Sequence, residues 1–259
     1  MKKIGLLVLA LSLASSAFAG TLKVGASPAP HAEILHFAGP LLEKEGIVLD
    51  VVEFTDYVLP NLSLAQKDLD ANFFQHVPYL ESFAKERGLD LVSLGAVHLE
   101  PMALFSQKLK SLDELKDGAS IAIPSDATNG GRALLLLEKL GLIKLAEGVG
   151  LEATELDVAE NPKKLKFTAL EAAQLARVLP DVDVAVINGN YALEGGLKLQ
   201  DALAHEDGQS PYANILAVRK GDKSREDLQK LLSVLQGPEV AAFIEKQYDG
   251  AVLPVNPTK

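Results

Sequence analysis

Residues 120–140 read SIAIPSDATNGGRALLLLEKL and predict a strand, a turn and a helix in direct succession. Residues 120–124 form a short apolar run of the length of a buried strand. Residues 128–140 carry apolar side chains at helical spacing, and Gly141 ends the run. A strand that leads directly into a helix is the building unit of α/β folds, so this stretch indicates that fold class.

The rest of the chain alternates in the same way. We expect strands at residues 22–26, 47–54, 70–73, 91–97, 166–170, 182–187 and 215–219. We expect helices at 31–45, 59–67, 79–87, 226–235 and 239–248, and a short helix that opens at Ser111. This alternation predicts parallel sheets. The sequence has neither a repeat nor a long linker, which favours two lobes joined by extended crossings near residues 100–106 and 210–218.

The first residues predict export. Lys2-Lys3 precedes an apolar run over residues 4–13, and Ala17-Phe18-Ala19 supplies the small residues of a cleavage site before Gly20. The run is shorter than the about 20 residues that span a bilayer, and the order of these features is that of a cleaved signal peptide. We therefore expect residues 1–19 to be a signal peptide and the mature chain to be periplasmic or otherwise extracytoplasmic. A buried N-terminal strand or helix is the alternative.

The composition narrows the possible partners. The chain contains no cysteine, which excludes disulfides and Cys-based metal sites. A bacterial lipoprotein carries its lipid on a cysteine at the cleavage point, where this chain has Gly20, so we expect a soluble mature protein. The formal net charge of −10 gives no electrostatic footprint for nucleic acid or anionic lipid. No nucleic-acid partner is expected.

The predicted turn before residue 128 has the features of an anion site. Thr128 is a suitable N-cap, and the N–H groups of Asn129, Gly130 and Gly131 would point out of the helix start. The two glycines would let a ligand approach the backbone, and Arg132 could bind a carboxylate. A capped helix with a surface arginine explains the same residues equally well. A phosphate loop is excluded because no G-K-[ST] follows the glycines.

Two further clusters stand at the ends of predicted strands. Residues 70–79 crowd aromatic side chains around His76, which suits a small apolar pocket with a polar edge or an ordinary core. Tyr57 fits either interpretation. Asn188 follows a buried strand, where ligands bind in open α/β sheets, and an Asx turn is the alternative. Asn214 has a similar place before another strand.

Signatures of enzymes and metal sites are missing from the sequence. It contains no G-x-S-x-G, no H-E-x-x-H and no cysteine nucleophile. His31 and His36 are too far apart in the helical repeat to share a face as metal ligands would. We interpret these two histidines and His205 as structural or solvated residues. A spatial Ser–His–Asp arrangement remains compatible with the sequence, although no motif indicates one.

Taken together, the segments resemble the NlpA family of methionine-binding proteins, the substrate-binding components of methionine ABC transporters. The resemblance covers nearly the whole mature chain. It is carried by DYVLPN at 56–61, residues 70–79, HLEPM at 98–102, residues 128–139, NPKKLK at 161–166, LEAAQL at 170–175, residues 185–192 and SPYAN at 210–214. Members of this family are commonly lipoproteins, so the missing cysteine is a departure from the family pattern.

The resemblance implies a type II periplasmic-binding-protein fold, in which two α/β lobes close on the ligand about a two-strand hinge. One lobe would comprise residues 20–103 and 215–259, and the other residues 104–214. Arg132 would bind the ligand carboxylate. Asn188 and Asn214 would hold the amino-acid head group, with Asn129 close by. The resemblance also implies that the thioether would be enclosed by Tyr57, Phe74 and His76, with His98 as a neighbour. Sulfur–aromatic contacts suit methionine.

The implied function is the capture of L-methionine by a monomer and its delivery to the permease and ATPase complex of an ABC importer, without catalysis, cofactor or metal. Another small amino acid or a methionine-containing dipeptide is the alternative ligand. A hydrolase or transferase acting on a small acid is the alternative from another class. We also expect Arg132→Ala to lose ligand while the ligand-free fold survives, because an arginine that lines an open cleft does not support the core.

Overall fold

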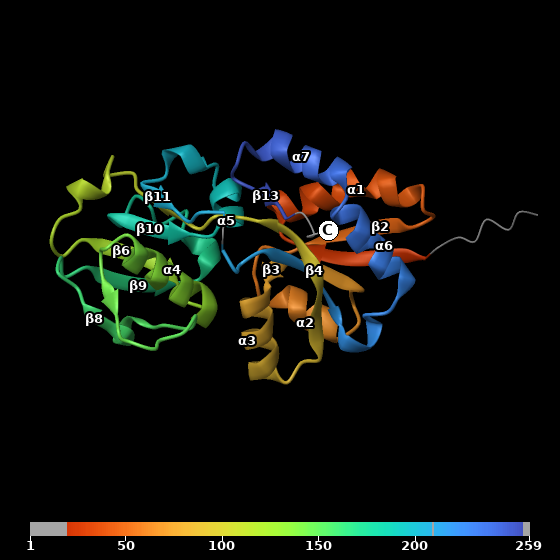
Figure 1. The fold of residues 1–259 in the computed structure, drawn as a ribbon, viewed down its shortest axis with the longest axis horizontal. Coiled ribbons are helices and arrows are strands. Elements are labelled where there is room, and N and C mark those ends of the chain that lie inside the picture. Colours follow the sequence, from red (N-terminus) through yellow and green to blue (C-terminus); the bar gives the residue numbers. More distant parts are fainter. Residues whose placement is uncertain (1–19, 209, 256–259) are drawn as a thin grey trace, which may run out of the picture.

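The structure, a computed structural model, describes residues 20–208 and 210–255, and the predicted signal peptide lies outside these residues. Two α/β lobes lie side by side along the longest axis of the molecule (Figure 1). Each lobe is built around its own sheet. The predicted architecture of two α/β lobes is therefore confirmed. Within the described residues, no helix is both long enough and apolar enough to span a bilayer.

The first lobe contains a six-stranded sheet in the order β13-β4-β12-β3-β1-β2. Its strands are β1 (Thr21–Ala26), β2 (Val48–Glu53), β3 (Ala71–His76), β4 (Leu91–Leu99), β12 (Asn214–Arg219) and β13 (Leu253–Pro254). One face is covered by α1 (Glu33–Glu43), α6 (Glu226–Leu235) and α7 (Pro238–Tyr248), and the other by α2 (Leu59–Ala65) and α3 (Val77–Arg87). A five-residue π-type segment, η1 (Pro28–Ala32), precedes α1.

Strand β12 shows how both faces of this sheet are buried. Leu216 and Val218 belong to the core under α1, α6 and α7, whereas Ile215 and Ala217 belong to the core under α2 and α3. Successive side chains of a strand point to opposite faces, so a strand buried on both sides favours an uninterrupted apolar run. Each fully buried Leu or Ile contributes about 1.5–3 kcal/mol, and the run 215–218 is buried to 1% exposure or less.

The second lobe contains a five-stranded sheet in the order β11-β5-β10-β6-β9. Its strands are β5 (Ala103–Phe105), β6 (Ser120–Pro124), β9 (Lys166–Leu170), β10 (Val184–Ile187) and β11 (Ala204–His205). Helix α4 (Ala127–Lys139) follows β6 and helix α5 (Gly189–Glu194) follows β10. A small hairpin of β7 (Lys144–Leu145) and β8 (Val158–Glu160) and single 3-10 turns complete this lobe.

Both sheets are mixed, so the prediction of parallel sheets is only partly right. Strands β2-β1-β3 and β10-β6-β9 pair in parallel, but β12 runs antiparallel to β3 and β4, and β5 runs antiparallel to β10 and β11. Strand β13 is also antiparallel to β4. The helix expected to open at Ser111 is a single 3-10 turn, η2 (Leu112–Glu114), because Leu115 adopts an extended conformation and is buried.

The chain passes between the lobes twice. The first crossing, residues 100–102, connects β4 to β5, and the second connects β11 to β12. The crossings are hydrogen-bonded to each other, since the Glu206 N–H donates to the Met102 carbonyl over 2.9 Å. The first crossing is shorter than the expected residues 100–106, and the second begins earlier than residue 210. Both differences arise because Ala103–Phe105 already pairs with the second sheet.

Candidate ligand-binding site

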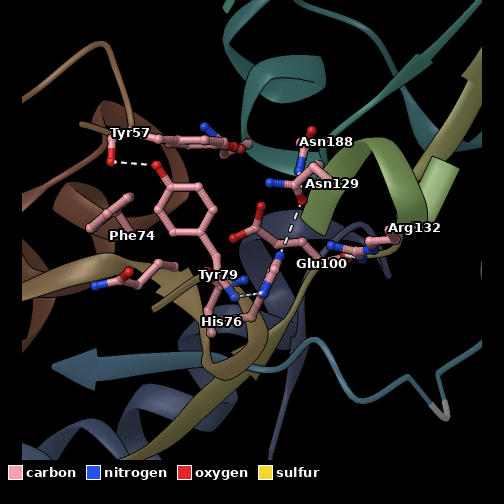
Figure 2. A pocket seen from close by; sticks show the side chains of 12 residues that line it. Tyr57, Phe74, His76, Tyr79, Glu100, Asn129, Arg132 and Asn188 are labelled. Carbon is pink, nitrogen blue, oxygen red and sulfur yellow. Dashed lines mark hydrogen bonds between the residues drawn. The ribbon is translucent and has the colours of Figure 1, made fainter. Parts of the chain in front are cut away.

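A small pocket lies between the lobes and encloses about 320 Å³ of space, part of it open to solvent. It is lined by Tyr57, Phe74, Gln75, His76, Tyr79, Glu100, Asn129, Arg132, Asn188, Gly189, Asn190 and Asn214. Aromatic side chains of the first lobe stand on one side, and polar side chains from α4 and the start of α5 stand on the other (Figure 2).

All of the residues implied by the family resemblance line this pocket except His98. His98 lies beneath it, with no exposure, and its Nε2 is 2.6 Å from Oε1 of Glu100. Sequence reasoning did not single out Gln75, Tyr79, Glu100, Gly189 or Asn190. Two signals pointed to some of them: Gln75 and Tyr79 lie in the aromatic cluster, and Asn190 follows a predicted strand end.

The apolar wall is a group of aromatic rings in tilted and edge-on contact. The ring centroid of Tyr57 is 5.7 Å from those of both Phe74 and Tyr79, and 4.9 Å from that of Tyr191. The Tyr79 hydroxyl donates to the Tyr57 carbonyl over 2.9 Å, which holds the first two tyrosines together. The Tyr57 hydroxyl reaches across to the second lobe and donates to Oδ1 of Asn190 over 2.5 Å. This wall therefore closes the pocket and links the lobes.

The expectation that Thr128 caps α4 is wrong. The N-cap is Asp126, whose Oδ1 accepts from the Asn129 N–H at 2.9 Å, while its carbonyl accepts from the Gly130 N–H at 2.8 Å. A carboxylate satisfies the orphan donors and the positive end of the helix dipole better than a hydroxyl. The N–H groups of Asn129 and Gly130, which were expected to face an anion, are thus already occupied by Asp126.

The predicted role of the two glycines is also wrong. A Cβ atom on Gly131 would lie 2.1 Å from the Leu151 carbonyl oxygen, and one on Gly130 would lie 2.9 Å from the Pro124 carbonyl oxygen. These glycines therefore allow α4 to pack closely against neighbouring backbone rather than against a ligand.

A polar network orients the side chains opposite the aromatic wall. The carboxylate of Asp126 accepts from Nδ2 of Asn129 at 2.9 and 3.0 Å, so Oδ1 of Asn129 faces the pocket. That oxygen accepts from Nδ2 of Asn188 at 2.8 Å and is 3.1 Å from Nε2 of His76. Since Nδ1 of His76 accepts from the Tyr79 N–H, the proton of this ring sits on Nε2. Asp126 thereby fixes the amide orientation and the tautomer together.

The same network leaves one buried acceptor without a partner. Nδ2 of Asn188 is directed to Asn129, and Oδ1 of Asn188 has no hydrogen bond from the described residues. Asn188 is only 5% exposed. A buried polar atom without a partner costs about 1–3 kcal/mol. Such an atom in a pocket lining is a docking point for a donor supplied by a ligand.

Glu100 brings a carboxylate into the middle of the pocket. Its Oε1 lies 2.6 Å from Nε2 of His98 and 3.2 Å from Nε2 of His31, whose ring also lies 3.1 Å from Oδ1 of Asn214. Burial raises the pKa of Glu100, whereas a protonated His31, the charge of Arg132 and the Asn190 N–H act to lower it. Burial lowers the pKa of His31 to about 4 and that of His98 to about 3, so both rings are neutral near pH 7.

These three side chains are close enough to surround a metal ion. Histidines that ligate metals usually donate their other ring N–H to a second partner. Nδ1 of His31 and Nδ1 of His98 are both buried and have no hydrogen bond from the described residues. The geometry fits two neutral imidazoles donating to a carboxylate, and it assigns neither a metal nor a cofactor.

Arg132 reaches the pocket from α4, but it does not line an open cleft as expected. It is 3% exposed and pairs with Glu206, with Nε 2.8 Å from Oε1 and Nη2 2.5 Å from Oε2. Nη2 also donates to the Glu100 carbonyl over 3.0 Å. The premise that this side chain does not support the fold is therefore wrong. Its removal would leave a largely buried carboxylate unpaired.

Comparisons with known proteins identify the family. The sequence model of the NlpA lipoprotein family matches residues 22–256. The D-methionine-binding lipoprotein MetQ of Salmonella typhimurium is 49% identical over 82% of this chain and 79% of its own length. The structure of a nutrient binding protein from Burkholderia cenocepacia bound to methionine is 50% identical. It covers 90% of this chain and 99% of its own, with a TM-score of 0.88.

A third relative has the same fold at lower identity. The lipoprotein Tp32 of Treponema pallidum is 43% identical and superimposes with a TM-score of 0.88 over 91% of this chain and 99% of its own. The match to the family model extends from β1 to the end of the described residues and includes every residue of the pocket. The chain belongs to the NlpA lipoprotein family.

Proposed function

We propose that this protein captures methionine between its two lobes and delivers it to an ABC importer, without catalysis. One observation carries this proposal. A single small pocket combines an acidic and acceptor corner, a guanidinium and an aromatic wall, which together complement an α-amino acid with an apolar, polarisable side chain. The neutral histidines around it add donors without adding charge.

The ligand ammonium would occupy the corner of Asn188 and Glu100. Oδ1 of Asn188 is the buried acceptor without a partner, and the Glu100 carboxylate stands in the same pocket. The carboxylate would be bound by Arg132, because Nη1 donates to no residue among 20–208 and 210–255. Asn214, held through its Oδ1 by His31, would direct its amide nitrogen to the head group. Charge-assisted hydrogen bonds of this kind are about twice as strong as neutral ones.

The thioether would lie against Tyr57, Phe74 and Tyr79, with His76 at its edge. Sulfur–aromatic contacts contribute about 0.3–1.5 kcal/mol each. The names of the relatives support this side chain, since the Salmonella protein is a D-methionine-binding lipoprotein and the Burkholderia protein was solved with methionine bound. We propose L-methionine as the ligand and test D-methionine beside it.

A longer ligand is the second candidate, and one observation favours it. A larger space of about 940 Å³, part of it open to solvent, adjoins the pocket and shares Tyr57 and Tyr79 with it. A methionine-containing dipeptide could keep its head group in the pocket and extend past these rings. Another small amino acid would fill only the pocket itself.

Delivery requires opening and closure of the lobes, which we place at residues 20–103 with 215–259 and at residues 104–214. The contacts of Tyr57 with Asn190 and of Tyr191 with the Thr55 carbonyl join the lobes across the pocket. A relative from Coxiella burnetii is a periplasmic substrate-binding protein of an ABC transporter. We propose that this chain works as an extracytoplasmic monomer with a permease and an ATPase, and that it is released in soluble form because Gly20 follows the predicted cleavage site.

The test uses protein from which bound ligand has first been stripped by unfolding and refolding. Calorimetry with L-methionine, D-methionine, leucine and methionyl dipeptides should show saturable 1:1 binding that is tightest for L-methionine. At 100 times its Kd a ligand stabilises the fold by about 2.7 kcal/mol, so the thermal midpoint should rise. Mass spectrometry should recover the ligand unchanged. Absence of any shift with methionine would refute the ligand, and turnover would refute the binding-protein function.

A further inference from the structure

Glu206 lies outside the pocket, yet it contacts the side chain that we assign to the ligand carboxylate. It belongs to the second crossing between the lobes, and its carboxylate is 12% exposed. One oxygen accepts from Nε of Arg132 and the other from Nη2, which is the side-on bidentate geometry of a strong arginine–carboxylate pair.

The same carboxylate is tied to the first crossing. Oε2 of Glu206 accepts from the Met102 N–H over 3.0 Å, and the Glu206 N–H donates to the Met102 carbonyl over 2.9 Å. Arg132 adds a bond from Nη2 to the Glu100 carbonyl over 3.0 Å. A residue of α4 is in this way fixed to both segments that join the lobes.

The hydrogen bonds just described use only some of the N–H donors of Arg132. A guanidinium has five N–H donors in one plane. Glu206 takes one from Nε and one from Nη2, and the Glu100 carbonyl takes the second from Nη2. The Tyr212 ring covers the plane, with its centroid 4.3 Å from the central carbon of the guanidinium. Only the two N–H groups of Nη1 lack an acceptor among the described residues, and Arg132 lines the pocket.

We propose that Glu206 is a positioning residue for carboxylate recognition. It fixes the plane of the Arg132 guanidinium, keeps Nε and Nη2 away from the ligand, and so presents Nη1 alone to the pocket. Because Glu206 also holds Met102, it couples the bound carboxylate to the two crossings. This inference rests on the proposed role of Arg132 in binding the carboxylate of an amino acid.

A role of Glu206 through its charge alone and a role in positioning Arg132 predict opposite effects on ligand binding, so an experiment can distinguish them. If Glu206 acted only through its negative charge, its neutralisation would strengthen the binding of a ligand carboxylate and weaken the binding of a cation. If Glu206 positions Arg132, its neutralisation should weaken the binding of the carboxylate ligand selectively, because the guanidinium is then free to turn its other N–H groups toward the pocket or toward water.

The experiment compares L-methionine with L-methioninamide, which lacks the carboxylate, in wild-type protein and in Glu206→Gln. Wild type should prefer methionine. In Glu206→Gln the Kd for methionine should rise about 10- to 100-fold, the effect of one hydrogen bond to a charged group, and the Kd for methioninamide should change little. Asp207→Asn, which neutralises the adjacent exposed acid paired with Lys139, is the matched control and should preserve the preference.

The remaining outcomes contradict the proposal in different ways. Equal weakening of both ligands in Glu206→Gln would show a merely structural role, and an unchanged or larger preference for methionine would show that Glu206 does not position Arg132. If wild type itself does not distinguish the two ligands, the carboxylate site at Arg132 is wrong, and this inference is wrong with it. Should Glu206→Gln fail to fold, Glu206→Asp keeps the charge but shortens the reach, and it should show the same selective loss at a smaller size.

Discussion

The amide nitrogen of Asn188 lies 2.8 Å from Oδ1 of Asn129, and this contact leaves the amide oxygen of Asn188 buried, with no partner in the part of the chain that the structure describes. The orientation is forced, since Asp126 holds the amide nitrogen of Asn129 and turns its oxygen to the pocket. The Asp126 cap of α4 thus determines that the oxygen of the Asn188 amide, at the start of α5, is the atom that faces the ligand. An unsatisfied acceptor in the free protein becomes a satisfied one when an ammonium arrives.

Asn188→Ala should therefore weaken methionine binding while sparing the fold. The loss of one hydrogen bond to a charged ammonium corresponds to about 1.5–3 kcal/mol, or about 10- to 150-fold in Kd. The free energy of unfolding of the ligand-free protein should change by about 1 kcal/mol or less, because the variant also removes the unsatisfied oxygen. Calorimetry and urea denaturation measure the two quantities.

Asn72→Ala is the matched control for this variant. Asn72 is fully buried in the first lobe, and its amide is hydrogen-bonded to the Pro60 carbonyl, Asn61 and Gln75. Its truncation should lower the free energy of unfolding by about 1–3 kcal/mol and leave the Kd nearly unchanged. The assignment of Asn188 fails if both variants lose stability and affinity alike.

Tyr57→Phe should accelerate ligand release. The Tyr57 hydroxyl bridges the lobes through Oδ1 of Asn190, whereas the ring itself would contact the thioether. Removing the hydroxyl costs the closed form about 0.5–1.5 kcal/mol and keeps the apolar wall. Stopped-flow fluorescence should show a dissociation rate about 2- to 10-fold higher with a nearly constant association rate. A change confined to the association rate would contradict the role of this contact in holding the lobes closed.

The sequence predicted the elements that carry apolar periodicity and left out those that do not. Strand β6 lies within residues 120–124, as predicted, because it is an uninterrupted apolar run. Strands of two or three residues, such as β5, β11 and β13, are too short to show a pattern, and their pairing depends on the path of the chain between lobes.

The site was predictable to a similar extent. Arg132 is predictable because it lies in the first turn of a predicted helix, where anions bind, and Asn188 because it follows a strand end, where ligands bind. Glu100 was overlooked because an acidic residue before a proline looks like a solvated turn. Its burial against His31 and His98 is a tertiary contact between segments far apart in the sequence. Helix α4 is capped by Asp126, two positions before the predicted cap Thr128. The carboxylate of Asp126 therefore binds a helix N–H group that was expected to bind a ligand anion.

The buried histidines should make the ligand-free protein sensitive to acid. Burial, together with the charge of Arg132, lowers the pKa of His76 to about 3. The unfolded chain binds this proton near pH 6.5, so the contribution of the neutral ring is complete above that pH and is lost as the pH falls toward 3. For His76 alone the loss is about 2 kcal/mol at pH 5. His31 and His98 act in the same direction.

His76→Gln isolates this effect from the carboxylates that oppose it. Burial raises the pKa of Glu194 to about 7, so this group binds a proton in the folded state first and stabilises the fold as the pH falls. Comparing the two proteins by urea denaturation from pH 7.5 to 5 cancels such terms. The variant should lose less stability than wild type, by about 1.4 kcal/mol per pH unit below pH 6. Parallel curves, or an imidazole signal of His76 that titrates above pH 6, would contradict the prediction.

Gly131→Ala should destabilise the second lobe, although alanine is the better helix former. Its Cβ atom would meet the Leu151 carbonyl oxygen at 2.1 Å, so backbone must move. Overpacking of this kind costs about 1–3 kcal/mol. Gly39→Ala is the control: this glycine also lies inside a helix, α1, and a Cβ atom there meets nothing within 4 Å. It should stabilise the fold by about 0.5–1 kcal/mol. Thermal melts that rank the two variants in the reverse order would refute the packing argument.

The contribution of Arg132 to binding can be separated from its contribution to the fold only with its partner. Arg132→Met should abolish most methionine affinity, since loss of a buried charge pair with the ligand costs about 2–5 kcal/mol. It should also lower the free energy of unfolding by about 3–5 kcal/mol, because Glu206 is left as an uncompensated and largely buried charge. A single variant therefore confuses the two effects.

The double variant Arg132→Met with Glu206→Gln resolves them. Replacing both members of a buried ion pair by neutral side chains of similar volume is often neutral or stabilising. The amide oxygen of the new glutamine can still accept from the Met102 N–H, as the carboxylate does. We expect the free energy of unfolding of the ligand-free double variant, measured with urea, to return to within about 1 kcal/mol of wild type, while methionine still produces no thermal shift. Binding that returns together with stability would mean that the ligand carboxylate is held by groups other than Arg132. Stability that stays low would instead place the loss in the contact of the guanidinium with the Tyr212 ring, which neither replacement restores.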